Sequence, residues 1–150
     1  MKIYVASSWR NPHQPKTVEV LRSAGHEVYD FRNPDPADPA NKGFAWQEID
    51  PEWESGQLVT AERWRKMVDS EAAVLGHSLD LDAMEWADAC VYLLPCGRSA
   101  SFEAGWFAGR RLPVVVLALE ATEPELMFRE AAIVGSFADM LDALVGAWVR

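Results

Sequence analysis

Short apolar runs alternate with helical patterns along most of this chain, and that alternation limits the possible folds more than any other feature. The runs Lys2–Ser7, Ala89–Pro95 and Pro113–Leu119 have the length and largely apolar character of buried strands, and residues 26–31 and 131–134 add two shorter ones. Strands that alternate with helices form a mainly parallel sheet with helices on both faces. The sequence therefore predicts an α/β fold with a five-stranded sheet.

Capping and turn residues set the expected limits of the helices. Gly25 is expected to stop the first helix, whereas Thr60 and Ser78 are expected to cap two later ones. Residues 32–43 contain three prolines and are expected to form a long loop, of the kind that often serves function. The predicted helices cover residues 16–23, 60–73, 78–87, 102–111, 124–130 and 136–149.

The size and charge of the chain exclude several classes of partner. Its 150 residues are enough for one domain with a sizeable core, so residues 1–150 are expected to form a single domain. A formal net charge of −9 argues against nucleic acid or an anionic membrane as partner, because phosphate binding depends on clustered Lys and Arg. No apolar run reaches the ~20 residues of a membrane span, and the first residues read as a strand rather than a signal peptide. These features predict a cytoplasmic protein.

The cysteines and histidines give no sign of a metal or redox site. Cys90 and Cys96 lie six positions apart, which is neither a zinc nor a redox spacing, and they are expected to be reduced thiols. The three histidines have no spacing typical of metal ligands. We therefore expect neither a metal nor a cofactor.

Glu103 is the most informative polar residue. In doubly wound folds, ligands bind at the carboxyl ends of the strands, and three segments are expected to meet there: Ser7–Asn11, the loop after Phe31, and Cys96–Glu103. Glu103 is expected in about the first turn of a helix, where the N-terminus stabilises a carboxylate by about 0.3–1 kcal/mol. First-turn glutamates are also common for that reason alone, and position does not separate the two interpretations.

The turn Gly97–Ser101 is a candidate binding site rather than a nucleophile elbow. The pattern G-x-S-x-G needs glycine where Ser101 stands, and no histidine follows it in the sequence. Backbone N–H groups from Gly97 onward, with the hydroxyls of Ser99 and Ser101, suit a phosphate or a ribose hydroxyl. The alternative is ordinary helix capping by Ser99.

Five other polar or aromatic positions are also candidate site residues. Ser7 and Arg10 follow the first strand in a segment with no glycine-rich phosphate loop; Arg10 suits a phosphate or carboxylate but also fits a surface arginine. Trp46 is a candidate base-stacking residue, or else a packing residue. Asp80 and Asp82 lie two positions apart and cannot share a helix face; they are either solvated or a source of a second carboxylate for glycosyl transfer.

The densest motif runs from Ser78 to Val116. The segment Ser78–Asp88, the strand that follows it, and Gly-Arg-Ser-Ala-Ser-Phe-Glu-Ala-Gly-Trp at residues 97–106 resemble the nucleoside 2-deoxyribosyltransferase family. They are also similar to the deoxynucleoside 5′-monophosphate N-glycosidases of the same superfamily. Tyr4 in the opening strand fits the family's first strand. The resemblance spans most of the chain and implies a flavodoxin-like three-layer αβα sandwich.

The resemblance also implies roles for individual residues. It makes Glu103 a nucleophile that forms a covalent glycosyl-enzyme intermediate, and Tyr4 an active-site tyrosine. Asp80 is implied as the residue that assists departure of the base, with Asp82 as the nearby fallback. The family likeness further implies a homodimer or a larger homo-oligomer.

The predicted function is cleavage or transfer at the N-glycosidic bond of a nucleoside or (deoxy)nucleotide. Gly97 departs from the family, because the transferases have an acidic residue there and the monophosphate hydrolases a serine. The choices of base, sugar, 5′-phosphate, and transfer or hydrolysis therefore stay open. The alternatives are a non-catalytic nucleotide-binding or sensing module and an N-glycosidase acting on a larger nucleotide such as NAD.

Overall fold

The computed structural model describes residues 1–34, 37, 43–54 and 56–148. The chain forms two compact units, the first from Met1–Asp30 with Trp86–Arg150 and the second from Phe31–Glu85. This division into compact units does not test the prediction of a single domain. Most of the long loop expected at residues 32–43 lies outside the described residues.

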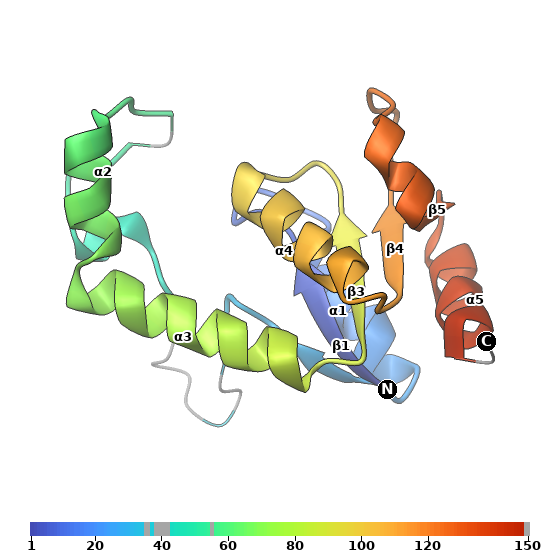
Figure 1. Ribbon diagram of the computed structural model, residues 1–150. Coiled ribbons are helices and arrows are strands. Elements are labelled where there is room, and N and C mark those ends of the chain that lie inside the picture. The colour runs from blue at the N-terminus through green and yellow to red at the C-terminus, as the bar shows by residue number, and fades with distance from the viewer. Residues whose placement is uncertain (35–36, 38–42, 55, 149–150) are drawn as a thin grey trace. The chain divides into compact units, whose positions relative to one another are not determined.

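The first unit contains a parallel sheet in the order β2-β1-β3-β4-β5 (Figure 1). This order places β1 beside β3. The chain adds β2 on one side of β1 and the later strands on its other side, while all five strands run parallel. The five strands found within the described residues match the five that the sequence predicted, and the flavodoxin-like αβα fold is confirmed. The strands are β1 (Lys2–Ala6), β2 (Glu27–Tyr29), β3 (Ala89–Leu93), β4 (Val114–Leu117) and β5 (Ala132–Val134).

Helices cover both faces of this sheet. The helices α1 (Gln14–Ser23) and α5 (Phe137–Trp148) pack on one face, and α4 (Arg98–Gly109) packs on the other, over β1, β3 and β4 (Figure 1). The period of two along each strand explains the division, because alternate side chains point to opposite faces. Val5 and Val91 belong to the apolar core beneath α1 and α5.

Gly25 ends α1 as expected. It has a φ of +87°, which a residue without a side chain adopts at no steric cost. The backbone N–H of Gly25 donates to the Arg22 carbonyl, and the N–H of His26 donates to the Leu21 carbonyl. These bonds satisfy the last carbonyls of α1 and turn the chain into β2.

In the second unit, one helix begins where the sequence predicted and the other begins earlier. Thr60 does cap α2 (Ala61–Val68), since its side chain accepts from the Arg63 N–H. The cap expected at Ser78 is wrong. α3 spans Glu71–Trp86, and the Ser78 hydroxyl, inside this helix, donates to the Val74 carbonyl at 3.0 Å. The break between α2 and α3 falls earlier than predicted, because the Ser70 hydroxyl accepts from the N–H of Ala73 at the start of α3.

Two further boundaries differ from the sequence-based expectation. α4 begins at Arg98 with Gly97 as its N-cap, so the serines that were expected in a turn lie inside the helix. The helix expected at residues 124–130 is a 3₁₀ segment, η2 (Leu126–Glu130). A second 3₁₀ segment, η1 (Trp46–Glu48), lies in the stretch whose secondary structure the sequence left ambiguous.

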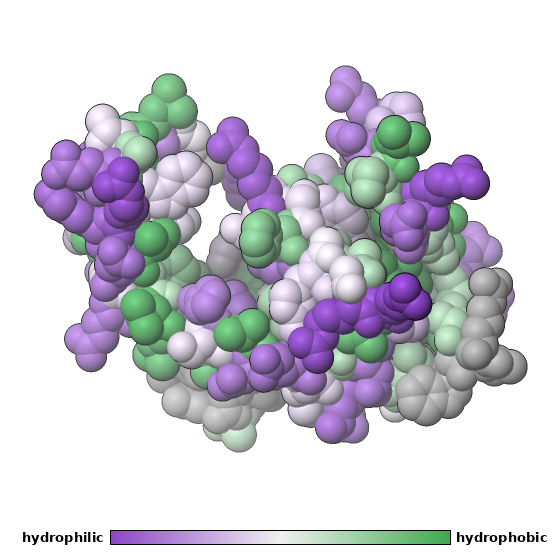
Figure 2. Space-filling view, viewed as in Figure 1, coloured by the Kyte–Doolittle hydropathy of each residue, from purple (hydrophilic) through white to green (hydrophobic). Residues whose placement is uncertain are grey.

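The surface in Figure 2 is mixed. Hydrophilic residues are spread over most of the face shown, and hydrophobic residues occur between them in small groups. Such a mixed surface agrees with the high proportion of charged residues, which is 25% of the chain.

Close packing in the second unit depends on Gly76. A Cβ atom built at this position would lie 2.5 Å from the Cβ of Phe44, which is closer than real carbon atoms approach. Phe44 in turn contacts Trp46 edge-on, with ring centroids 5.0 Å apart. Gly76 therefore allows the aromatic group to lie directly on α3.

We expect Gly76→Ala to lower the free energy of unfolding by about 1–3 kcal/mol, because overpacking outweighs the gain in helix propensity. Gly146→Ala in α5 is the matched control, since a Cβ there meets nothing within 4 Å. That variant should be neutral or slightly stabilising. Urea unfolding of both variants measures the difference, and equal midpoints would contradict the packing role of Gly76.

Candidate active site

The fold places its expected ligand-binding crevice at the carboxyl ends of β1 and β3. These strands are neighbours in the sheet, with Tyr4 opposite Cys90 and Ala6 opposite Tyr92. The segments that leave them, Ser7–Asn11 and residues 94–97, therefore start side by side. Two of the three segments expected to converge do so, while the loop after Phe31 belongs to the second unit and lies partly outside the described residues.

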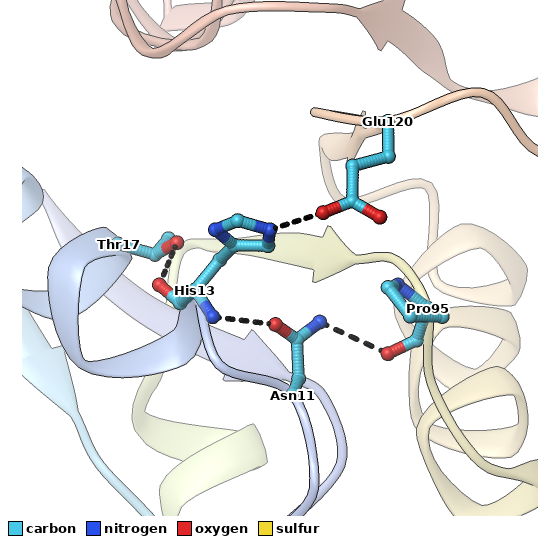
Figure 3. A network of polar contacts seen from close by, with 5 residues as sticks. All are labelled: Asn11, His13, Thr17, Pro95 and Glu120. Carbon is cyan, nitrogen blue, oxygen red and sulfur yellow. Dashed lines mark hydrogen bonds and ion pairs between the residues drawn. The ribbon is translucent and has the colours of Figure 1, made fainter.

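Hydrogen bonds join these two segments directly (Figure 3). The side-chain amide of Asn11 donates to the Pro95 carbonyl at 2.9 Å, and its oxygen accepts from the backbone N–H of His13 at 2.8 Å. Asn11 is 2% exposed, so both groups depend on protein partners. The Ser7 hydroxyl adds a bond to the Leu93 carbonyl at 3.3 Å. We call Asn11 with its two side-chain bonds the Asn11 clamp.

A weaker contact extends this network toward β4. His13 lies 2.9 Å from the Glu120 carboxylate, which follows that strand (Figure 3). Glu120 is largely exposed, so this ion pair adds little stability. The clamp at Asn11 is the stronger constraint on the crevice.

Tyr4 is buried beneath α4. Its ring stacks on Tyr29 with centroids 5.5 Å apart and contacts Phe107 of α4 at 5.7 Å. Only 1% of Tyr4 is exposed. Tyr4 therefore lies on the α4 face of β1, and its active-site role stays a prediction.

Glu103 lies on α4, the helix that packs over β1 and β3. Burial raises the pKa of the Cys90 thiol, and the negative charge of Glu103 raises it further. Burial and the same charge also raise the pKa of Cys96. Cys90 lies opposite Tyr4 in the sheet register. The charge of Glu103 therefore acts on a residue of β3 that is paired with β1.

The helix-dipole explanation for Glu103 is wrong. α4 begins at Arg98, so Glu103 is its sixth residue and lies in the second turn. The effect of a helix N-terminus falls off within the first turn. The position of Glu103 therefore results from packing of α4 on the sheet rather than from the helix end.

Tyr92 and Cys96 form a polar group that the sequence-based list of site residues omitted. The Tyr92 hydroxyl lies 2.7 Å from the Ser101 hydroxyl. Burial raises the pKa of Tyr92 to about 12, and a hydrogen bond with the Cys96 thiol contributes to the rise. Tyr92 has the same strand face as Cys90, two positions earlier, so the period of two could have identified it.

The start of α4 presents several of the predicted binding residues. Ser99 is exposed in the first turn, and Gly97, not Ser99, occupies the N-cap position without a side-chain bond. The predicted capping role of Ser99 is therefore wrong. Arg10 is also exposed, in the loop after β1. Ser101 is held by Tyr92, as described above.

A groove of about 480 Å³ follows another flank of α4. Ser101, Gly105 and Gly109 line it from the helix, and Phe128 of η2 lines it from the other side. At about 100° per residue, Glu103 points some 200° round the helix from Ser101. The groove therefore does not lie on the Glu103 side of α4.

The remaining candidates belong to the second unit. Trp46 packs against Phe44 and, with centroids 6.0 Å apart, against Trp53. Asp80 and Asp82 lie on α3, where Asp80 is half-buried and Asp82 is exposed. Their different exposure agrees with the expectation that they do not share a helix face.

Within the part of the chain that is described, no three His, Cys, Asp or Glu side chains gather to hold a metal ion. Cys90 and Cys96 are both free thiols. Among the described helices, none is long and apolar enough to cross a membrane.

Known structures share this fold, although no protein-family model and no curated protein matches the chain. One similar structure is a 2-deoxyribosyltransferase from the psychrotolerant bacterium Bacillus psychrosaccharolyticus, with 23% identity over 93% of this chain and 90% of that chain, at a TM-score of 0.56. Another is a conserved protein from Enterococcus faecalis V583, with 15% identity over 97% of this chain and 98% of that chain, at a TM-score of 0.55. A CMP N-glycosidase from Clostridium botulinum has 16% identity over 96% and 97%, at a TM-score of 0.47. The first two establish the flavodoxin-like fold along nearly the whole chain.

We expect Asn11→Ala to lower the free energy of unfolding by about 1–3 kcal/mol, because it leaves the Pro95 carbonyl and the His13 N–H without their partner. Glu120→Gln, which weakens the exposed ion pair with His13, should lower the free energy of unfolding by less than about 1 kcal/mol. Urea unfolding compares the two, and an equal loss would contradict the greater importance of the clamp.

The proximity of Glu103 to Cys96 can be tested by thiol reactivity. Glu103→Gln removes a negative charge that raises the pKa of Cys96, so more thiolate forms and reaction with Ellman's reagent at pH 8 should accelerate about two- to fivefold. Tyr92→Phe should slow the reaction, because the Tyr92 hydrogen bond lowers that pKa. Unchanged rates in both variants would contradict the arrangement.

Proposed function

We propose that this chain cleaves or transfers the N-glycosidic bond of a nucleoside or (deoxy)nucleotide through a glycosyl-Glu103 intermediate. The observation that carries the proposal is the packing of α4, the helix that includes Glu103, over β1 and β3. Doubly wound folds bind their ligands at the carboxyl ends of such strands. The likeness of the fold to a 2-deoxyribosyltransferase, the family that the sequence resembles, supports the same chemistry.

The first step is a displacement at the anomeric carbon. A Glu103 oxygen attacks C1′, the C1′–N bond breaks, and its electron pair leaves with the base. Asp80 gives the departing base a proton, with Asp82 as the alternative donor. Tyr4, fixed between Tyr29 and Phe107, holds the carboxylate in line.

The second step regenerates the enzyme. Water or a second base attacks C1′, and the bond from C1′ to the Glu103 oxygen breaks. Attack by water passes one proton to the Asp80 carboxylate and gives a free sugar, whereas attack by a base returns the proton from its N–H to Asp80 and gives a new nucleoside. The reaction needs neither metal nor cofactor.

The binding residues proposed in the first unit come from the loop after β1 and from the start of α4. Arg10 supplies a positive charge for an anionic group, which a protein of net charge −9 must provide locally. Gly97 and Ser99 offer backbone N–H and hydroxyl groups at the start of α4. Ser7 contributes a hydroxyl for the sugar, whereas Ser101, predicted from the sequence for the same purpose, bonds to Tyr92 on the other flank of α4 and is not assigned it.

Trp46 and Asp82 complete the proposed binding set from the second unit. Trp46 is proposed to contact the face of the base, and Asp82 is proposed to contact the polar edge of the base. A homodimer or larger assembly and a cytoplasmic location remain predictions that follow from the resemblance and the sequence.

We expect Glu103→Gln to lower kcat/KM by about a thousandfold or more, because the amide is not a nucleophile. The assay is liquid chromatography of ribo- and deoxyribonucleosides, their 5′-monophosphates and NAD, each with and without a second base. Intact-protein mass spectrometry should find a sugar adduct on the wild-type protein and none on the variant.

Glu125→Gln is the matched control, since Glu125 is exposed on the connection after β4. It should leave turnover unchanged. Free base without exchange identifies a hydrolase, and a new nucleoside identifies a transferase. Full activity in Glu103→Gln contradicts the proposal, and binding without any turnover favours the sensing module.

A further inference from the structure

The first turns of α4 pack on the sheet through small side chains. Ala100 and Ala104 are the buried residues of this helix before Phe107. A methyl group makes few van der Waals contacts, so alanines hold the position of a helix on a sheet only weakly. Phe107 holds the later part of α4 through its ring contact with Tyr4. The earlier part, which includes Glu103, depends on an interaction other than apolar packing.

A hydrogen bond between Tyr92 and Ser101 supplies that interaction. The two hydroxyl oxygens are 2.7 Å apart, which is typical of a well-formed O–H···O bond. Ser101 is the fourth residue of α4 and stands two positions before Glu103. Tyr92 belongs to β3, where it is opposite Ala6 of β1 on one side and Val116 of β4 on the other. The bond therefore ties the first turn of α4 to a strand that is paired on both sides (Figure 1).

Tyr92 is itself held in place. Only 4% of this residue is exposed, and its ring meets Phe128 edge-on with centroids 5.6 Å apart. Its hydroxyl also has a hydrogen bond with the Cys96 thiol. These contacts restrict both side-chain torsions of the tyrosine. The Tyr92 hydroxyl is therefore a fixed point to which Ser101 attaches.

We propose that Tyr92 is a positioning residue, which holds Glu103 in place for reaction through the hydrogen bond to Ser101. This inference rests on the proposed function, in which a Glu103 oxygen attacks C1′. Displacement of a reacting group by about 1 Å lowers a reaction rate by about 100-fold. The Tyr92 and Phe107 contacts act on different flanks of α4, so together they oppose both rolling and sliding of the helix.

A double-mutant cycle on turnover of the best substrate tests this role. Tyr92→Phe and Ser101→Ala each remove one hydroxyl, and each should lower kcat by about 10- to 100-fold while KM changes less than about twofold. The double variant should lose no more than either single variant, because the two hydroxyls act as one unit. Ser101→Thr, which keeps the hydroxyl, should recover most of the activity. Ser101 is exposed, so Ser101→Ala gives the same reading if Tyr92→Phe does not fold.

Ser136→Ala is the matched control. The Ser136 hydroxyl accepts from the Asp139 N–H and donates to the Asp139 carboxylate at the start of α5, on the opposite face of the sheet from α4. Its loss should lower the urea midpoint about as much as Ser101→Ala does and leave kcat unchanged. A fall in kcat equal to that of Ser101→Ala would show a general effect of stability and overturn the inference.

Hydrogen exchange followed by mass spectrometry tests the fastening of α4 without turnover. Peptides from residues 98–109 should exchange about threefold faster or more in Tyr92→Phe, and those from α5 should not change. Turnover by the wild-type protein with unchanged kcat in Tyr92→Phe and Ser101→Ala would overturn the inference and leave the proposed function standing. In a protein without any turnover, faster exchange confined to α4 would sustain the fastening by Tyr92 and reject the proposed reaction, whereas unchanged exchange would reject both.

Discussion

Parallel pairing between β1 and β3 is the constraint on which the rest of this structure depends. It brings Tyr4 opposite Cys90 and starts two loops side by side at one edge of the sheet. Parallel neighbours cannot be joined by a tight turn, so long connections separate them in the sequence and leave their carboxyl ends open. The Asn11 clamp then closes the gap between the two loops with hydrogen bonds rather than with apolar packing. The two loops are therefore fastened to each other at this edge of the sheet.

The chemistry proposed for this crevice follows from where α4 lies. Packing of Phe107 against Tyr4 fixes the helix over β1, and the charge of Glu103 reaches Cys90 and Cys96 from the second turn. On the opposite flank, Ser101 bonds to Tyr92. One helix therefore separates a carboxylate suited to attack on a sugar carbon from a groove of different character. This arrangement places the proposed nucleophile by tertiary packing rather than by the helix end.

Sequence reasoning succeeded where the signal is local. Gly25 ends a helix and Thr60 begins one, as expected, because positive φ and side-chain capping depend on a few neighbouring residues. It failed at Ser78 and Ser99, which are able to cap but lie within helices. Capping residues compete, and apolar packing along the whole helix decides which of them is used. The sequence did not indicate the contact of Tyr92 with Ser101, because Ser101 belongs to the next element.

By itself, the sequence determined the five strands, the helices between them and the layered α/β fold, because hydrophobic periodicity is encoded residue by residue. It also indicated Glu103 as a candidate nucleophile through family resemblance. Only the tertiary structure decided which groups meet at the crevice. Asn11 and Pro95 are 84 positions apart, and their bond depends on strand order and register rather than on any local pattern.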